Sequence, residues 1–170
     1  TLYKVSLEEY KNIFNTKKLH RFNDDMATIF YNAIHKIVLD YDGDASNIWK
    51  NSPSSATVVS RFLDFDGIGI KIATMATNIL SRDFKIPLSD YYSIDVSPDV
   101  HVKRLFKRMG LIKKKDINNI DKIIYKARSI NPDFPGIIDL TCWKLGKKVC
   151  RPKLPKCEEC ILKDLCPKII

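Results

Sequence analysis

The chain has 170 residues, which is enough for one domain or for two small lobes that share a core. Hydrophobic residues make up 45% of it and charged residues 29%, a mixture typical of a folded globular protein rather than a disordered chain. The sequence contains neither an apolar run of about 18 residues nor a charged-then-apolar leader. We therefore expect a protein that does not span a membrane, is not secreted, and works in the cytoplasm or the nucleus.

The net charge favours a polyanionic partner. Lys and Arg number 29 against 20 Asp and Glu, which gives a formal net charge of +9. A positive surface is typical of proteins that bind the phosphate backbone of nucleic acids. It also occurs for solubility alone, so the charge balance by itself does not separate the two interpretations.

The first half of the chain has helical periodicity. Ser6 and Glu9 are spaced as a capping box that begins a helix. A longer helix is predicted from about Asn23 to the turn at residues 42–44, and a third, preceded by residues 53–55, is predicted through Leu63. The apolar stripe of the longer helix consists of Phe30, Ile34, Ile37, Val38 and Tyr41.

Two glycines interrupt the helical pattern between two predicted helices. Gly67 and Gly69 allow a tight turn, and Ile68 between them is expected to point into the core. The free N–H groups at the start of the second helix would face outward and bind phosphate. We interpret residues 55–80 as a helix–hairpin–helix motif that binds DNA without sequence specificity. Its predicted DNA contacts are Gly67, Ile68, Gly69, Ile70 and Lys71, and the stripe of its second helix is Ile72, Met75, Ala76 and Ile79.

The second half of the chain is also predicted to be helical. Residues 82–96 are expected to form a loop, and Ser97, Pro98 and Asp99 are predicted as N-cap, N1 and N2 of the next helix. Two further helices are predicted over residues 116–130 and 135–149. No segment has the length and alternation of a strand, so the predicted fold class is all-α.

Four of the five cysteines lie close together near the end of the sequence. Only two of them form the short pair that structural zinc sites use twice, separated by a longer arm. The uneven spacing, C-x6-C-x2-C-x5-C, favours one 4Fe–4S cluster, in which each thiolate binds a different iron. Zinc and two disulfides are the alternatives. The four predicted ligands are Cys150, Cys157, Cys160 and Cys166, whereas Cys142 and Trp143 are assigned to a helix core.

Three motifs occur in an order that resembles a known family. They are residues 67–73 (GIGIKIA), residues 99–104 (DVHVKR) and the four-cysteine loop. Together they resemble the endonuclease III branch of the helix-hairpin-helix DNA glycosylases, over most of residues 60–170. The resemblance implies a helical lobe over residues 1–131 and a C-terminal helix with a 4Fe–4S loop over residues 132–170. It also implies that the family's N-terminal helices are missing here, as in a fragment or a compact variant.

The resemblance further implies a reaction. Family members excise a damaged base, and the bifunctional ones then cut the strand through a lysine that attacks the sugar C1′. In this sequence that lysine is Lys71, and the assisting aspartate is Asp99, with Asp95 as the second candidate. An amine attacks only in its neutral form, and a carboxylate can stabilise the oxocarbenium-like charge on the sugar. The implied partner is damaged double-stranded DNA, bound by a monomer.

The cysteine loop is implied to have a structural role. Lys153 and Lys156 belong to its basic surface, which would contact DNA phosphates away from the chemistry. Two alternatives to the bifunctional enzyme stay open. One is a monofunctional glycosylase in which Asp99 activates water, and the other is a DNA-binding module without catalysis. The sequence does not identify the damaged base.

Overall fold

The computed structural model describes residues 2–169, and within that range every regular element is a helix. This confirms the predicted all-α fold class. The α-helices are α1 (Leu7–Lys17), α2 (Asn23–Asp40), α3 (Ser55–Leu63), α4 (Ile70–Arg82), α5 (Val100–Arg108), α6 (Ile120–Ile130) and α7 (Ile138–Lys148). Short 3-10 turns occur at Leu2–Lys4, Ala45–Ile48, Lys114–Asp116, Pro135–Ile137 and Cys157–Glu159. None of the helices in this range is long and apolar enough to cross a membrane.

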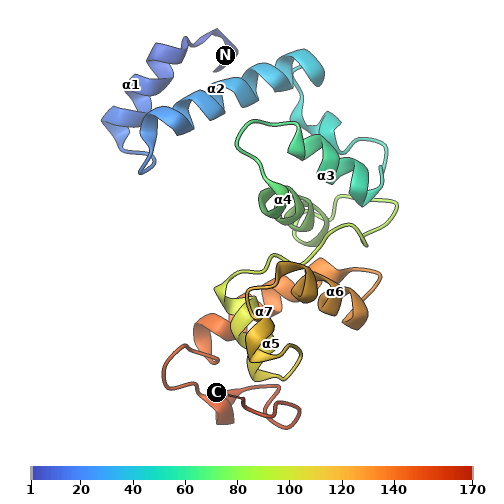
Figure 1. Ribbon diagram of the computed structural model, residues 1–170. Coiled ribbons are helices and arrows are strands. Elements are labelled where there is room, and N and C mark those ends of the chain that lie inside the picture. The colour runs from blue at the N-terminus through green and yellow to red at the C-terminus, as the bar shows by residue number, and fades with distance from the viewer. Residues whose placement is uncertain (1, 170) are drawn as a thin grey trace.

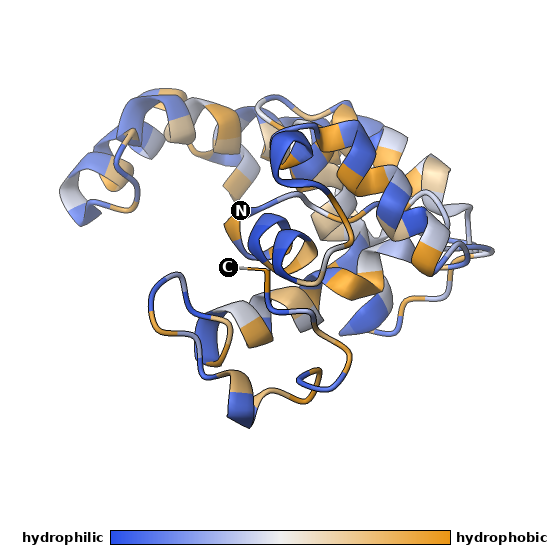
Figure 2. Ribbon diagram, turned by 60° about the horizontal axis from the view of Figure 1, so that its bottom comes forward, coloured by the Kyte–Doolittle hydropathy of each residue, from blue (hydrophilic) through white to orange (hydrophobic). Residues whose placement is uncertain are grey.

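The helices are arranged along an elongated molecule. α1 and α2 lie at one end, α5 to α7 and the C-terminal loop lie at the other, and α4 lies between them (Figure 1). Hydrophobic and hydrophilic residues alternate along the ribbons, as Figure 2 shows in orange and blue. Amphipathic helices of this kind are stable only when their apolar sides pack against one another.

The N-terminal helices form a hairpin that is held by aromatic side chains. The predicted capping box begins α1, because Ser6 N–H donates to the Glu9 carboxylate at 2.8 Å and Glu9 N–H donates to Ser6 Oγ at 3.3 Å. Tyr10 is buried against α2 and makes edge-to-face contacts with Phe30 and Tyr31. The predicted start of α2 at Asn23 is confirmed.

Two hydrophobic clusters form the interior. The first joins the end of α2, α3, α4 and the following loop, and its buried members are Ile48, Val58, Phe65, Leu88 and Ile94. The second joins α5, α6 and α7, and its largest buried side chains include Phe106, Ile123 and Val102. α5 and α6 thus share a cluster with α7, although the sequence assigned them to the lobe of residues 1–131. The division at residues 131 and 132 stays a prediction.

The buried face of α4 differs from the predicted one. Ile72 is 52% exposed and Ile79 is 36% exposed, so the predicted apolar stripe lies largely toward solvent. The buried face is made of small and polar residues, namely Ala73, Thr74, Thr77, Asn78 and Ser81. They can be buried because the hydroxyls of Thr74, Thr77 and Ser81 donate to carbonyls one turn earlier in the same helix. Hydrophobic periodicity cannot identify a face of this kind.

α5 and α7 approach closely at a glycine. A Cβ on Gly146 would lie 2.9 Å from the Cβ of His101, on the facing side of α5. Arg104 fixes the contact, because its Nη2 lies 2.8 Å from the Gly146 carbonyl oxygen and 2.9 Å from His101 Nδ1. Neither partner can move without breaking this network, so position 146 has no room for a side chain.

The first prediction concerns this contact. We expect Gly146→Ala to lower the free energy of unfolding by about 1–3 kcal/mol, although alanine favours helix, because the added methyl overpacks the interface. Urea denaturation monitored by circular dichroism measures the change. Gly69→Ala is the comparison variant, since a Cβ at position 69 meets nothing within 4 Å, and its loss of stability should be limited to about 0.5–1 kcal/mol from the N-cap preference for glycine over alanine. Equal stability of both variants would show that α5 and α7 can separate to accept a methyl group.

Candidate functional site

The hairpin between α3 and α4 has the geometry of the predicted motif. Gly67 has a φ of +73°, in the left-handed region that favours glycine, and a Cβ there would lie 2.8 Å from Ile29 Cδ1. Ile68 is partly buried and packs against the first hydrophobic cluster, as the sequence predicted. The hairpin is therefore fixed to α2 and to the core on one side and open on the other.

The open side of the hairpin leads into the N-terminus of α4. Gly69 is the N-cap and has no side chain to bond the first N–H groups. The first turn closes when the N–H groups of Ile72 and Ala73 donate to the Gly69 carbonyl, at 2.9 and 3.0 Å. The N–H groups of residues 69–71 precede this turn and point out of the positive end of the helix dipole. This arrangement suits a phosphate, and the DNA contacts at residues 67–71 stay predictions.

A cavity of about 280 Å³ lies where α4, the start of α5 and α7 meet. Asp99 lines it, and so does the α4 face that carries Met75 and Asn78. Lys71 lies one helical turn before Met75 on the same side of α4, with an exposed side chain. The remaining lining residues are Ile79, Arg82, Ser97, Val102, Asp139, Leu140 and Trp143. The fold thus brings the two predicted catalytic residues to the same side of α4, with Asp99 in the cavity itself.

Asp99 is the N-cap of α5. Its backbone is extended, and its Oδ1 accepts from the N–H groups of His101 and Val102, both at 2.8 Å. The predicted cap, Ser97, is two residues too early, because Ser97 and Pro98 form the approach to the helix rather than its first turn. These two bonds fix the orientation of the Asp99 carboxylate toward the cavity.

The second candidate aspartate has a different environment. Asp95 makes a two-bond ion pair with Arg128, at 2.7 and 2.8 Å, on the α6 side of the loop. It does not line the cavity. This geometry favours Asp99 over Asp95 as the functional carboxylate, and the assignment stays a prediction.

Sequence reasoning missed Asp139, which lies in the first turn of α7. Both of its carboxylate oxygens accept from the Ser97 N–H, at 2.9 and 3.1 Å. The pKa of Asp139 is raised to about 7, mainly by burial and also by the negative charge of Asp99, against the opposing effects of the Ser97 bond and of Arg82. One signal for Asp139 was available in the sequence. Asp139 comes four residues before Trp143, so the two side chains lie on the same face of the helix.

The two residues that the sequence assigned to the core of α7 have different environments in the structure. Cys142 is buried in the second hydrophobic cluster, as predicted. Trp143 is instead 45% exposed and lines the cavity, where Lys147 lies 4.7 Å from its ring centroid. An aromatic ring at a cavity wall beside a cation is available to stack on a planar ligand.

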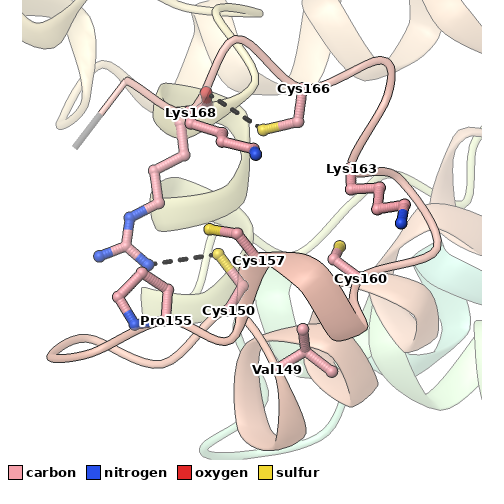
Figure 3. Close-up of a pocket in the computed structure, with 9 residues that line it drawn as sticks. Val149, Cys150, Pro155, Cys157, Cys160, Lys163, Cys166 and Lys168 are labelled. Carbon is pink, nitrogen blue, oxygen red and sulfur yellow. Dashed lines mark hydrogen bonds between the residues drawn. The ribbon is translucent and has the colours of Figure 1, made fainter.

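The four predicted cysteine ligands line one small cavity of about 40 Å³ in the C-terminal loop. Their sulfur atoms face a common space (Figure 3), and none is in a disulfide, so the disulfide alternative is not realised. Within residues 2–169, however, no three His, Cys, Asp or Glu side chains converge closely enough to hold a single metal ion. In a 4Fe–4S cluster each thiolate binds a different iron. Four thiols around one space are a donor set that fits such a cluster, and the choice between iron and zinc stays a prediction.

A buried arginine adds support for a negatively charged group in this loop. Arg108 is 7% exposed and its Nη1 donates to Cys150 Sγ at 3.3 Å. Its other bonds go to the carbonyls of Arg151 and Pro152, at 2.7 and 2.9 Å. A buried guanidinium is costly without a nearby negative charge, and thiolates at the cysteines would supply one.

The basic residues predicted to contact DNA lie on the surface of the same loop. Lys153 and Lys156 are both exposed. Lys156 forms an ion pair with Glu159 at 2.8 Å, which neutralises part of its charge. Both DNA contacts stay predictions.

Comparisons with known proteins agree with this geometry. No family model matches the sequence. Endonuclease III of Thermotoga maritima is 29% identical over 108 residues, which cover 64% of this chain and 45% of that protein. Endonuclease III of Synechocystis sp. is 30% identical over 135 residues, which cover 79% of this chain and 52% of that protein.

A solved structure shares the fold. It is a trapped endonuclease III–DNA covalent intermediate, and it matches 98% of this chain and 67% of that chain with a TM-score of 0.62 and 19% sequence identity. The chain is endonuclease III-like. This confirms the family resemblance that the three motifs carried. The endonuclease III-like chain spans about half the length of the two curated relatives described above.

The second prediction follows from the burial of Asp139. Because the folded state holds its proton up to about pH 7 and an unfolded aspartate releases it near pH 4, stability should fall as the pH rises through this window. Asp139→Asn cannot ionise, so its free energy of unfolding should exceed that of the wild type by on the order of 2 kcal/mol at pH 8, with the difference shrinking toward pH 4. Urea denaturation across this pH range measures it.

The control for this prediction is Asp121→Asn, an exposed aspartate on α6. It makes the same change of charge without the burial. If the difference in the free energy of unfolding between the wild type and Asp139→Asn does not vary with pH, Asp139 is ionised across the whole pH range measured.

Proposed function

We propose that this chain acts in DNA base-excision repair as a glycosylase with abasic-site lyase activity. The observation that carries the proposal is the cavity beside the hairpin. It is lined by Asp99 and by the α4 face on which Lys71 lies, and a phosphate-binding hairpin directly precedes that lysine. The similarity to proteins named Endonuclease III supports the same reaction class. The proposed partner is damaged double-stranded DNA.

In the proposed reaction the hairpin holds the DNA backbone and Lys71 does the covalent chemistry. The free N–H groups before α4 bind a phosphate and place the sugar beside the first turn of the helix. Neutral Lys71 Nζ attacks C1′, and the glycosidic bond breaks with its electron pair leaving on the base. Asp99 stabilises the positive charge that develops on the sugar, because its carboxylate is held toward the cavity by two N–H groups.

The second step cuts the strand. The Lys71 adduct opens the sugar to a Schiff base, which makes the C2′ proton acidic. A base removes that proton, and the C3′–O bond breaks with its electron pair leaving on the phosphate. Asp99 is the proposed group for moving protons in this step, since two α5 N–H groups fix its carboxylate and it lines the cavity.

We also propose that Cys150, Cys157, Cys160 and Cys166 hold one 4Fe–4S cluster. When bound, such a cluster supplies four fixed anchor points to a loop that has little hydrophobic core of its own. The loop in turn presents Lys153 and Lys156 to DNA phosphates. Arg108 orients Cys150 through its Nη1–H bond to the sulfur.

The third prediction tests the lyase. Borohydride should trap the chain covalently on duplex DNA that contains one abasic site, because it reduces the Schiff base to a stable amine. Lys71→Ala should abolish the adduct, whereas Lys17→Ala, an exposed lysine at the end of α1, should retain it. Denaturing gel electrophoresis resolves the slow-migrating adduct.

Two results would contradict this assignment in different ways. An adduct that survives in Lys71→Ala would move the nucleophile to another amine. Tight binding of abasic DNA with no wild-type adduct would overturn the lyase and favour a hydrolytic glycosylase or a DNA-binding module.

The fourth prediction tests the cluster. The anaerobically purified chain should contain about four iron atoms and absorb broadly near about 400 nm. Cys157→Ala should lose this absorption, and Cys142→Ala should keep it, because Cys142 is buried in the α5–α7 core and does not line the cysteine cavity. Zinc in place of iron by metal analysis would refute the cluster.

A further inference from the structure

Two residues that line the cavity carry buried polar atoms without a hydrogen-bond partner. Asn78 is 1% exposed and Ser97 is 2% exposed. In the part of the chain that the structure describes, Asn78 Oδ1 and Ser97 Oγ make no hydrogen bond, and both residues line the cavity. Buried polar atoms without a partner are uncommon in folded proteins, which sets this wall of the cavity apart from the rest of the interior.

Asp139 lies among these groups and faces the same cavity. The Ser97 N–H bonds to both of its oxygens and so fixes the plane of the carboxyl group. The charges that face it are Asp99 at the start of α5 and Arg82 on α4, and on its own helix Cys142 is the neighbouring titratable group. Burial and the charge of Asp99 outweigh Arg82, so the pKa of Asp139 lies near 7 and its neutral form is available at physiological pH.

The structure assigns Asp139 as a base-contacting residue, which donates a hydrogen bond from its carboxyl O–H to a carbonyl oxygen of the nucleobase turned into this cavity. This inference rests on the proposed function and names the residue that recognises the base. The ligand class is a nucleobase that has a carbonyl oxygen. Asn78 borders the same cavity, where its Nδ2 donates to the Gly136 carbonyl at 2.7 Å and so fixes this part of the wall.

The cavity walls suit a planar base. Met75, Ile79, Leu140 and Trp143 contribute apolar surface, and the aromatic ring of Trp143 is half-exposed, with Lys147 over it at 4.7 Å from its centroid. The volume of about 280 Å³ is near the lower end of the range for small-ligand pockets, which is appropriate for a single base. Apolar walls with a few fixed polar groups are the usual composition of a site that orients a small ligand.

The proposed contact should also assist the chemistry. As the glycosidic bond breaks, negative charge develops on the base and spreads to its carbonyl oxygens. A hydrogen bond from neutral Asp139 strengthens at that point, whereas an ionised carboxylate would repel the leaving base. Base excision should therefore fall as the pH rises through about 7, in the direction set by the titration of Asp139.

The fifth prediction compares two reactions of the same protein. Duplexes that carry one uracil, one dihydrouracil or one thymine glycol report base excision, and a duplex with one abasic site reports strand cleavage without a base to contact. The readout is the ratio of the two single-turnover rates from about pH 5.5 to about pH 8.5. Any pH dependence that the two reactions share cancels in the ratio, so the remaining pH dependence belongs to recognition of the base.

For the wild type we expect this ratio to fall about tenfold for each pH unit above about 7. In Asp139→Asn the amide N–H₂ remains a donor and cannot ionise, so the ratio should be independent of pH and should exceed the wild-type value at high pH. Asp139→Leu, which has no donor, should lower the ratio about tenfold at pH 6. Asp121→Asn should follow the wild-type profile.

The outcomes separate this inference from the proposed function. Where abasic cleavage persists, a ratio that keeps the wild-type pH profile in Asp139→Asn, or a ratio that is undiminished in Asp139→Leu, would overturn the role of Asp139 alone. Abasic cleavage without excision of any of the three bases would also overturn it, since the cavity would then not accept a base. Absence of abasic cleavage by the wild type would instead refute the proposed function.

Discussion

The position of the cavity depends on a backbone junction between the two hydrophobic clusters. The Gly136 N–H donates to the Ile94 carbonyl at 2.7 Å, and the Gly136 carbonyl accepts from Asn78 at 2.7 Å. A Cβ at Gly136 would lie 2.7 Å from Ile94 Cγ2, so only glycine allows this approach. The junction joins α4, the loop before α5 and the turn before α7, which are the elements that surround the cavity. Without these Gly136 hydrogen bonds, the helices that carry Asp99 and Asp139 would not be held in a fixed position relative to α4.

Two carboxyl groups in one cavity can have different roles when their environments differ. Asp99 accepts from two N–H groups at the start of α5, an arrangement that stabilises a carboxylate. Asp139 accepts from a single N–H, and burial, together with the nearby charge of Asp99, raises its pKa to about 7. Opposed environments of this kind give one site both an anion for the sugar and a neutral donor for the base. Because the charge of Asp99 helps to raise the pKa of Asp139, replacing Asp99 with a neutral residue should lower the pKa of Asp139.

The sequence predicted the parts of the fold that depend on local rules. The capping box at Ser6, the turn at Gly67 and the helical class follow from side chains within a few residues of each other, and all three agree with the structure. The buried face of α4 was predicted wrongly, because hydroxyls that bond within their own helix can be buried in place of aliphatic side chains. Asp139 was missed for a related reason. Its burial results from contact with Ser97, 42 residues away in the sequence, and no local pattern reports such a contact.

α5 connects the two functional regions of the molecule. It begins at Asp99 in the cavity and ends at Arg108 beside the cysteines, a span of about 13 Å for a nine-residue helix. Arg104 and Arg108 donate to the carbonyls of Cys150, Arg151 and Pro152, so the start of the cysteine loop is bonded directly to this helix. A cluster that fixes the loop would thereby also fix the axis of α5 and the direction in which Asp99 faces. The four cysteines can thus influence the site without contacting the substrate, since a helix of this length transmits a displacement of one end to the other.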